Sequence, residues 1–108
     1  KLTALNLNHC TGLTNAAIIE ITEKCPKFTA LSIGGCTDLT DAAIIAIAKN
    51  CTELTSLNLA ICSRITNTAI IEIAKNCPNL TDLNLNGEQS LIREGVYLNL
   101  YEIKKIDR

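Results

Sequence analysis

Residues 54–62 read Leu54-Thr55-Ser56-Leu57-Asn58-Leu59-Ala60-Ile61-Cys62, and their pattern of aliphatic positions recurs along the whole chain. The central Leu-x-Leu or Leu-x-Ile triplet begins at positions 5, 31, 57 and 83, so that every step has the same length. A fixed period of about 20 to 50 residues is typical of repeat proteins, whose units are too small to bury their own apolar sides and therefore stack. The sequence predicts a solenoid.

The period divides a single domain into consecutive units. Residues 1–4 are the tail of a preceding repeat, repeats 1 to 3 span 5–30, 31–56 and 57–82, and a degenerate closing repeat or cap spans 83–108. Because the chain starts at Lys1 and contains no Met, we expect it to be a piece of a longer protein.

Each unit reads as a strand followed by a helix. Leu57 and Leu59 alternate with period two, so both side chains point inward from a short strand. Apolar residues then follow helical spacing, and Thr66 and Asn67 supply oxygens for the unpaired N–H groups at the helix start. Stacked units predict a curved α/β solenoid, with a four-strand parallel sheet on the concave face and helices on the convex face.

The fourth unit departs from the pattern, and two interpretations of residues 91–104 stay open. Leu91, Val96 and Leu100 keep the apolar register of a helix. The alternation in residues 96–101 favours a strand instead. In either case we expect Ile106 to continue the series of apolar residues that ends each unit, namely Leu2, Phe28, Leu54 and Leu80.

Composition excludes several classes of protein. Hydrophobic residues make up 47% of the 108 residues, which excludes a disordered chain. The apolar runs are much shorter than the roughly 20 residues of a membrane span. Ten basic and eleven acidic residues nearly cancel, and no basic stripe indicates a nucleic acid or an anionic membrane as partner.

The repeat resembles a known family. The pattern Leu-x-x-Leu-x-Leu-x-x-Cys, followed by Ile65-Thr66-Asn67 and closed by residues 74–80, resembles the cysteine-containing class of leucine-rich repeats. This class occurs in F-box proteins, the substrate receptors of SCF ubiquitin ligases. The resemblance implies a leucine-rich repeat horseshoe segment, a curved module that recruits another protein inside the cell. No F-box segment is present in the sequence, so docking to the ligase does not follow.

The six cysteines follow the repeat and form two ladders: Cys10, Cys36 and Cys62; and Cys25, Cys51 and Cys77. Three rungs leave one cysteine unpaired in each ladder, so buried free thiols are favoured over disulfides or a metal site. Adjacent His9 and Cys10 suggest a base and a nucleophile, but neighbouring strand residues point to opposite sides. We therefore expect Cys10 inside and His9 at the surface, with no catalytic, cofactor or metal site.

The residues that flank the buried leucines are expected to face a partner. This candidate concave face consists of Asn6, Asn8, His9, Ser32, Asn58, Ile61, Asp82, Asn84 and Asn86. It is small and neutral, and it is rich in hydrogen-bonding groups. The sequence predicts a non-catalytic protein-interaction module, with an unidentified protein as its partner and neither nucleic acid nor membrane.

Two alternatives to a dedicated receptor remain at this stage. The chain can be a structural repeat scaffold, idealised or designed, or an uncapped fragment, with no ligand of its own. In addition, the amino-terminal coil has no visible cap. Its exposed strand and helix edges are expected to favour self-association.

Overall fold

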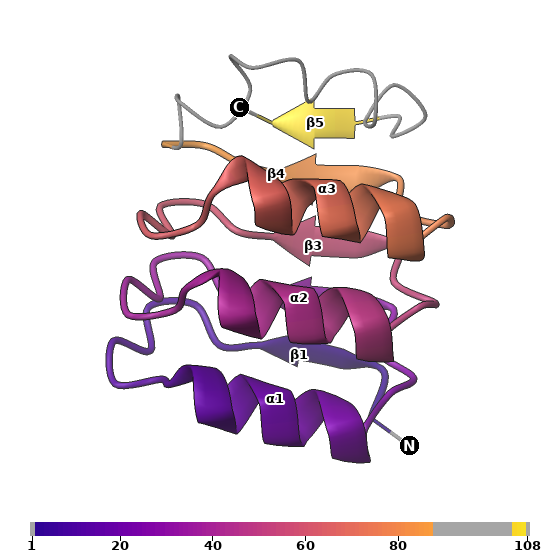
Figure 1. Cartoon of the computed structure of the whole chain (residues 1–108), viewed down its shortest axis with the longest axis horizontal. Helices are drawn as coiled ribbons and strands as arrows, with labels where there is room; N and C mark the ends of the chain where they lie inside the picture. Colours follow the sequence, from indigo (N-terminus) through magenta and orange to yellow (C-terminus); the bar gives the residue numbers. More distant parts are fainter. Residues whose placement is uncertain (1, 88–104, 108) are drawn as a thin grey trace.

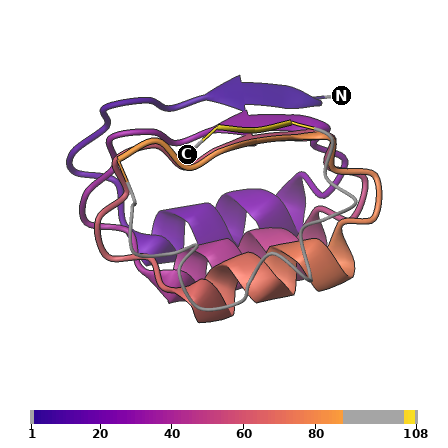
Figure 2. The ribbon, with the colours of Figure 1, turned by 90° about the horizontal axis from the view of Figure 1, so that it is seen from above.

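The computed structural model describes residues 2–87 and 105–107 and confirms an α/β solenoid. Within these residues, five strands form one parallel sheet in the order β1-β2-β3-β4-β5, and Figure 1 shows the coils stacked along one direction. Figure 2 shows the sheet as one layer and the helices as the other. The elements are β1 (Ala4–Asn6), α1 (Asn15–Lys24), β2 (Ala30–Ser32), α2 (Asp41–Asn50), β3 (Ser56–Asn58), α3 (Asn67–Asn76), β4 (Asp82–Asn84) and β5 (Lys105–Asp107).

The register of the sheet follows the repeat across the first four strands. Leu31 pairs with Leu5 on one side and with Leu57 on the other, and Leu57 pairs with Leu83. The sheet has one strand more than predicted, because β5 pairs with β4 in parallel and aligns Ile106 with Leu83. This last step is shorter than the period of the repeat, so the prediction that Ile106 continues the series ending in Leu80 is wrong. The two interpretations of 91–104 lie outside the described residues.

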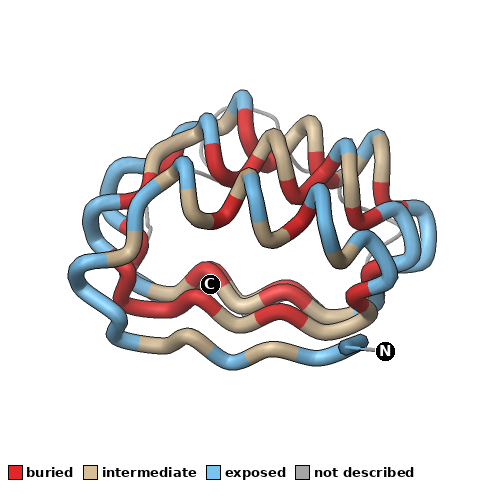
Figure 3. The backbone as a smooth tube through the Cα atoms, turned by 90° about the horizontal axis from the view of Figure 1, so that it is seen from below, coloured by how far each residue is buried: buried red, intermediate tan, exposed pale blue. Residues whose placement is uncertain are grey.

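The core lies between the two layers and depends on stacking. Leu31, Ile33, Leu57 and Leu59 of the sheet are at most 2% exposed, and Ile44, Ile47, Ile70 and Ile73 of the helices are fully buried. In the first coil, Leu5 and Leu7 remain only half-buried. Figure 3 shows this difference: the strand that ends at the N label is tan and pale blue, whereas the strands behind it alternate red and tan. The strand is exposed because no described coil lies on its outer flank.

Threonines begin the helices, but not all in the predicted way. Oγ1 of Thr14 accepts a hydrogen bond from Ala17 N at 3.2 Å and caps α1, and Thr40 caps α2 in the same manner. Thr66 makes no side-chain cap bond to α3. Its hydroxyl donates instead to Asp41 Oδ2 in the preceding coil, and its N–H donates to Asp41 Oδ1 at 2.7 Å. The predicted capping by Thr66 is therefore wrong, because Asp41 competes for its hydroxyl.

A similar pair of hydrogen bonds joins the first two coils, and each such pair is called a clamp below. Asn15 Nδ2 donates to Thr40 Oγ1 at 2.9 Å, and Thr40 N donates to Asn15 Oδ1 at 3.0 Å. The equivalent residue in the third coil, Asn67, has a buried Oδ1 without a hydrogen-bond partner among the described residues. The two clamps connect successive helix starts through polar groups as well as through the apolar core.

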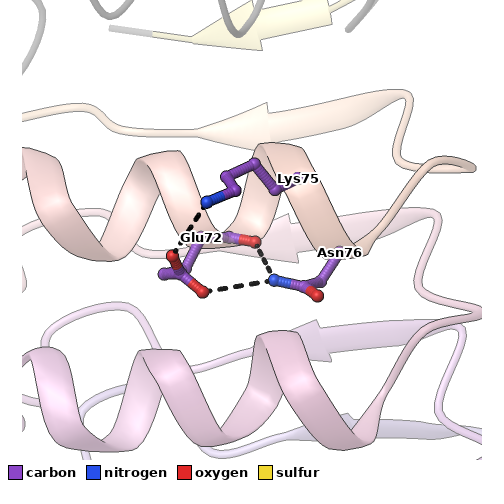
Figure 4. Close-up of polar contacts among 3 residues, drawn as sticks. All are labelled: Glu72, Lys75 and Asn76. Atoms are coloured by element: carbon purple, nitrogen blue, oxygen red, sulfur yellow. Dashed lines mark hydrogen bonds and ion pairs between the residues drawn. The ribbon is translucent and has the colours of Figure 1, made fainter.

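One polar cluster on the convex side is satisfied within a single helix. Figure 4 shows the cluster on α3, where Lys75 Nζ lies 3.6 Å from Glu72 Oε2. Asn76 Nδ2 donates to the carbonyl oxygen of Glu72 at 2.9 Å and to its carboxylate at 3.3 Å. Lys75 and Asn76 therefore both find their partner, Glu72, on their own helix.

Candidate protein-binding face

The strands place three rows of side chains on the concave face. The first row is Ala4, Ala30, Ser56 and Asp82; the middle row is Asn6, Ser32, Asn58 and Asn84; and the third row is Asn8, Gly34, Ala60 and Asn86. Residues of one row are adjacent because the parallel strands pair in the register of the repeat. Asp82 is the only charged residue in these three rows. The face therefore offers hydrogen bonds rather than charge.

Asparagines of the middle row are held in one orientation. Oδ1 of Asn6, Asn58 and Asn84 each accepts the backbone N–H two residues later, at 2.9 Å in all three cases. An Asx turn of this kind fixes which side of the carboxamide carries oxygen. The –NH₂ group is left on the other side, available to donate. Asn6 and Asn84 use none of these donors within the described part of the chain.

Ser32 replaces asparagine in the second coil, and a neighbouring coil compensates for it. Asn8 Oδ1 accepts from Ser32 Oγ at 2.6 Å and from Gly34 N at 2.8 Å. Asn58 Nδ2 donates to Ser32 Oγ at 3.0 Å from the other side. The result is a directed chain of hydrogen bonds across three coils, and each bond polarises the next. This network makes the centre of the face rigid.

After each of the strands β1 to β4, one position has a left-handed backbone. The φ angles are +64° at His9, +77° at Gly35, +61° at Ile61 and +87° at Gly87. The side chains of His9 and Ile61 each pack against the glycine at the same position of the next coil, Gly35 and Gly87 respectively. A Cβ built on Gly35 would overlap His9 Nδ1 and lie 2.9 Å from His9 Cε1, and one on Gly87 would lie 3.3 Å from Ile61 Cγ1. Glycine thus gives space to the neighbouring side chain as well as tolerating the conformation.

This arrangement defines one edge of the face. His9 is exposed, and the side chain of Ile61 is 54% exposed although it belongs to an aliphatic residue type. Beside them, a shallow groove of about 360 Å³ runs over β1 to β3, lined by Ala4, Asn6, Ala30, Ser32, Ser56 and Asn58 together with two leucines. The groove brings together Asn6, Ser32 and Asn58 of the predicted site, and its lining does not include the other predicted residues. The left-handed backbone that His9 and Ile61 share was not predicted, although Gly35 and Gly87 at the same repeat position signal it.

The six cysteines all lie in the described part of the chain, and they are thiols rather than disulfides. Cys36, Cys51, Cys62 and Cys77 are buried, as predicted, and the thiols of Cys36 and Cys62 donate to carbonyl oxygens of the preceding coil at 3.1 Å. Cys10 is exposed and Cys25 is only half-buried, so the prediction that Cys10 lies inside is wrong. Both belong to the first coil, whose flank no other described coil covers.

Burial also controls the chemistry of the inner thiols. Desolvation raises the pKa of Cys51 and of Cys77 from 9.0 to about 11, and the preceding thiol of the same ladder adds to the shift. Desolvation likewise raises the pKa of Cys36. A raised pKa keeps these thiols neutral and unreactive near neutral pH. Within the described residues, no group of three or more His, Cys, Asp or Glu side chains is placed to hold a metal ion.

Comparisons with known proteins agree with this fold. Residues 24–48 match the family model described as leucine-rich repeat. A search of the curated proteins finds no match. Among solved structures, "Leiomodin-1 Actin-Binding Site 2" is similar with a TM-score of 0.76 and 20% sequence identity, covering 99% of this chain and 70% of the other. The tropomodulin C-terminal domain from Caenorhabditis elegans has a TM-score of 0.73 and 14% identity, covering 99% and 73%.

The solved structures are below 25% identity, so they show the fold alone. The family match, residues 24–48, covers about the length of one repeat across repeats 1 and 2, and it supports a leucine-rich repeat. None of the described helices is both long enough and apolar enough to cross a membrane.

Proposed function

We propose that the protein is a non-catalytic interaction module that binds another protein through its concave sheet face. The observation that carries this proposal is the fixed middle row. Asn6, Asn58 and Asn84 have their carboxamide oxygens held by the backbone, so their –NH₂ groups are aligned before any partner arrives. Groups that are already ordered lose less conformational freedom on binding.

The geometry also indicates which groups of a partner would bind. Asn6 and Asn84 offer donors, whereas their acceptor atoms are already used. A complementary partner surface presents carbonyl or carboxylate oxygens to this row. In the first row, Ala4, Ala30 and Ser56 have small side chains and line the groove. Their small size leaves room for a segment of the partner protein.

The resemblance to F-box receptors supports the finer proposal that the module recruits a target protein inside the cell. Six thiols without a disulfide are consistent with a reducing compartment. Actin is a concrete first candidate as partner, because the leiomodin segment with this fold is named as an actin-binding site. The alternative function is a structural scaffold, an idealised repeat whose exposed face has no dedicated ligand.

The decisive experiment is capture of proteins from a cell lysate and, in parallel, of purified actin. The variants are Ser56→Arg, which blocks the groove, and Asn84→Asp, which removes the outward donor while keeping an oxygen for the backbone of Asn86. Thr68→Arg on the exposed surface of α3 is the matched control for added size and charge. We expect Ser56→Arg to abolish capture, Asn84→Asp to weaken it, and Thr68→Arg to leave it intact.

Two outcomes would contradict the proposal. Capture that is lost in Thr68→Arg but retained in Ser56→Arg would place the interface on the helices. Absence of any specific partner across lysate and actin would favour the scaffold. Thermal unfolding of each variant checks that loss of capture does not come from loss of the fold.

A further inference from the structure

Asn86 and Gly87 form the only asparagine–glycine pair in the sequence, and both residues are exposed. The pair lies just after β4 at the edge of the concave face, where Gly87 has a left-handed φ of +87°. Glycine has no Cβ, so nothing on it shields its backbone nitrogen from the side chain of the preceding residue. In such a pair, this nitrogen can reach the carboxamide carbon of the asparagine.

The carboxamide of Asn86 is also uncommitted, in contrast to that of Asn8 at the same repeat position. Asn8 Oδ1 accepts from Ser32 Oγ at 2.6 Å and from Gly34 N at 2.8 Å, so the neighbouring coil holds this side chain in place. The backbone N–H of Asn86 donates to Asn84 Oδ1 at 2.9 Å, but its carboxamide makes no hydrogen bond within the part of the chain that the structure describes. The side chain of Asn86 is therefore free to turn toward its own backbone.

We propose that Asn86 is a site of spontaneous covalent modification in the folded chain. The backbone nitrogen of Gly87 attacks Asn86 Cγ and loses its proton as the new bond forms. The Cγ–Nδ2 bond breaks, and the side-chain nitrogen leaves with that proton as ammonia. The cyclic imide then takes up one water, which opens either of its two carbonyl–nitrogen bonds. One product is aspartate at position 86, and the other is isoaspartate, in which the backbone continues through the side-chain carbon. Water is the only co-reactant.

Both products change the edge of the concave face. Each replaces a neutral carboxamide by a carboxylate, in three rows where Asp82 is the only charged residue. Isoaspartate also lengthens the backbone by one carbon, next to the carbonyl oxygen of Asn86 that accepts from Ile61 N at 2.9 Å. A resulting loss of affinity for partners that present oxygens rests on the proposed function, whereas the modification itself does not.

Incubation of the intact folded chain at mildly alkaline pH tests the proposal. Samples taken over time are digested and their peptides are identified by mass and by backbone linkage, with the unincubated chain as reference. Aspartate and isoaspartate should accumulate at position 86, while Asn8, which is followed by His9, stays intact. Asn86→Gln keeps an amide on a longer side chain and should yield no product at position 86. This readout does not depend on whether a partner binds the face.

His9→Gly separates the effect of the structure from that of the dipeptide, because it places the same dipeptide at positions 8 and 9. In the folded variant, Asn8 should react about tenfold more slowly than Asn86, since its two hydrogen bonds must break first. In urea, where these bonds are absent, the two positions should react at equal rates. An Asn86 that stays intact in the folded chain overturns the proposal. Equal rates at the two positions of the folded variant overturn it as well, because the free carboxamide would then have no influence.

Discussion

The imidazole of His9 lies against the backbone of Gly35, where a Cβ would overlap its Nδ1 and come within 2.9 Å of its Cε1. Gly35 itself has a φ of +77°, which side chains other than glycine seldom adopt. His9 and Gly35 occupy the same position of two successive repeats. Their contact joins the end of β1 to the next coil at the edge of the concave face.

Gly35→Ala should therefore destabilise the fold by about 2 kcal/mol, since it combines left-handed strain with a collision against His9. Gly12→Ala is the control, because no atom lies within 4 Å of a Cβ built there, and its effect should stay within about 0.5 kcal/mol. Urea unfolding measures both. Adding His9→Ala to Gly35→Ala should recover part of the loss; no recovery would show that the ring does not press on Gly35.

Replacing the asparagine at the start of a helix should lower the free energy of unfolding only where that asparagine forms a clamp to the next coil. Asn15→Ala deletes two hydrogen bonds to Thr40 and should lower the free energy of unfolding by about 1 to 2 kcal/mol. The matched change Asn67→Ala should cost less than about 0.5 kcal/mol, because Asn67 Oδ1 is buried without a partner among the described residues. Equal losses at the two sites would contradict the role of the clamp.

Equivalent leucines should differ in their contribution to stability according to their place in the stack. Leu57→Ala opens a cavity among residues that are almost fully buried and should cost about 3 kcal/mol. Leu5→Ala, at the same repeat position in the half-buried first coil, should cost about 1 kcal/mol. Denaturant unfolding at low protein concentration gives both values. The reverse order would mean that the first coil is not the exposed end.

Alkaline pH should destabilise the protein through its buried thiols. Cys51 and Cys77 have a pKa of about 11 in the folded chain against 9.0 when unfolded, so the unfolded state loses protons first as pH rises. Their stabilisation is complete below pH 9 and is lost between pH 9 and 11, by roughly 2 kcal/mol for each thiol. Unfolding free energy measured across this range should fall less steeply in Cys51→Ala. If the unfolding free energy of Cys51→Ala falls with pH as steeply as that of the natural chain, the pKa of Cys51 is not raised by burial.

The sequence predicts the stacking well because the repeat is local. Leu5, Leu31, Leu57 and Leu83 are evenly spaced along the chain, and the structure pairs them in that register. The same reasoning fails for Ile106, which pairs with Leu83 after a step shorter than the period. No Leu-x-Leu triplet of the strand pattern marks β5, so the sequence contains no signal for the register of the last strand.

The candidate face was predictable as a set of positions but not as a network. Alternation along the strands places Asn58 and Ser32 outward, which the structure confirms. It does not reveal that Asn8 reaches across to Ser32 and Gly34, because that contact joins different rows of two coils. Similarly, threonine at a helix start predicts a cap, and only the structure shows Asp41 binding the hydroxyl of Thr66 instead.

Thiol labelling of the folded chain tests most directly whether each coil buries the core residues of the coil that follows it. Cys10, Cys36 and Cys62 occupy one repeat position, yet Cys10 is exposed and the other two are fully buried. With a thiol reagent under native conditions, Cys10 should react rapidly, while Cys36 and Cys62 should react only after unfolding. If the three cysteines react at the same rate in the folded protein, the coils do not cover one another as described.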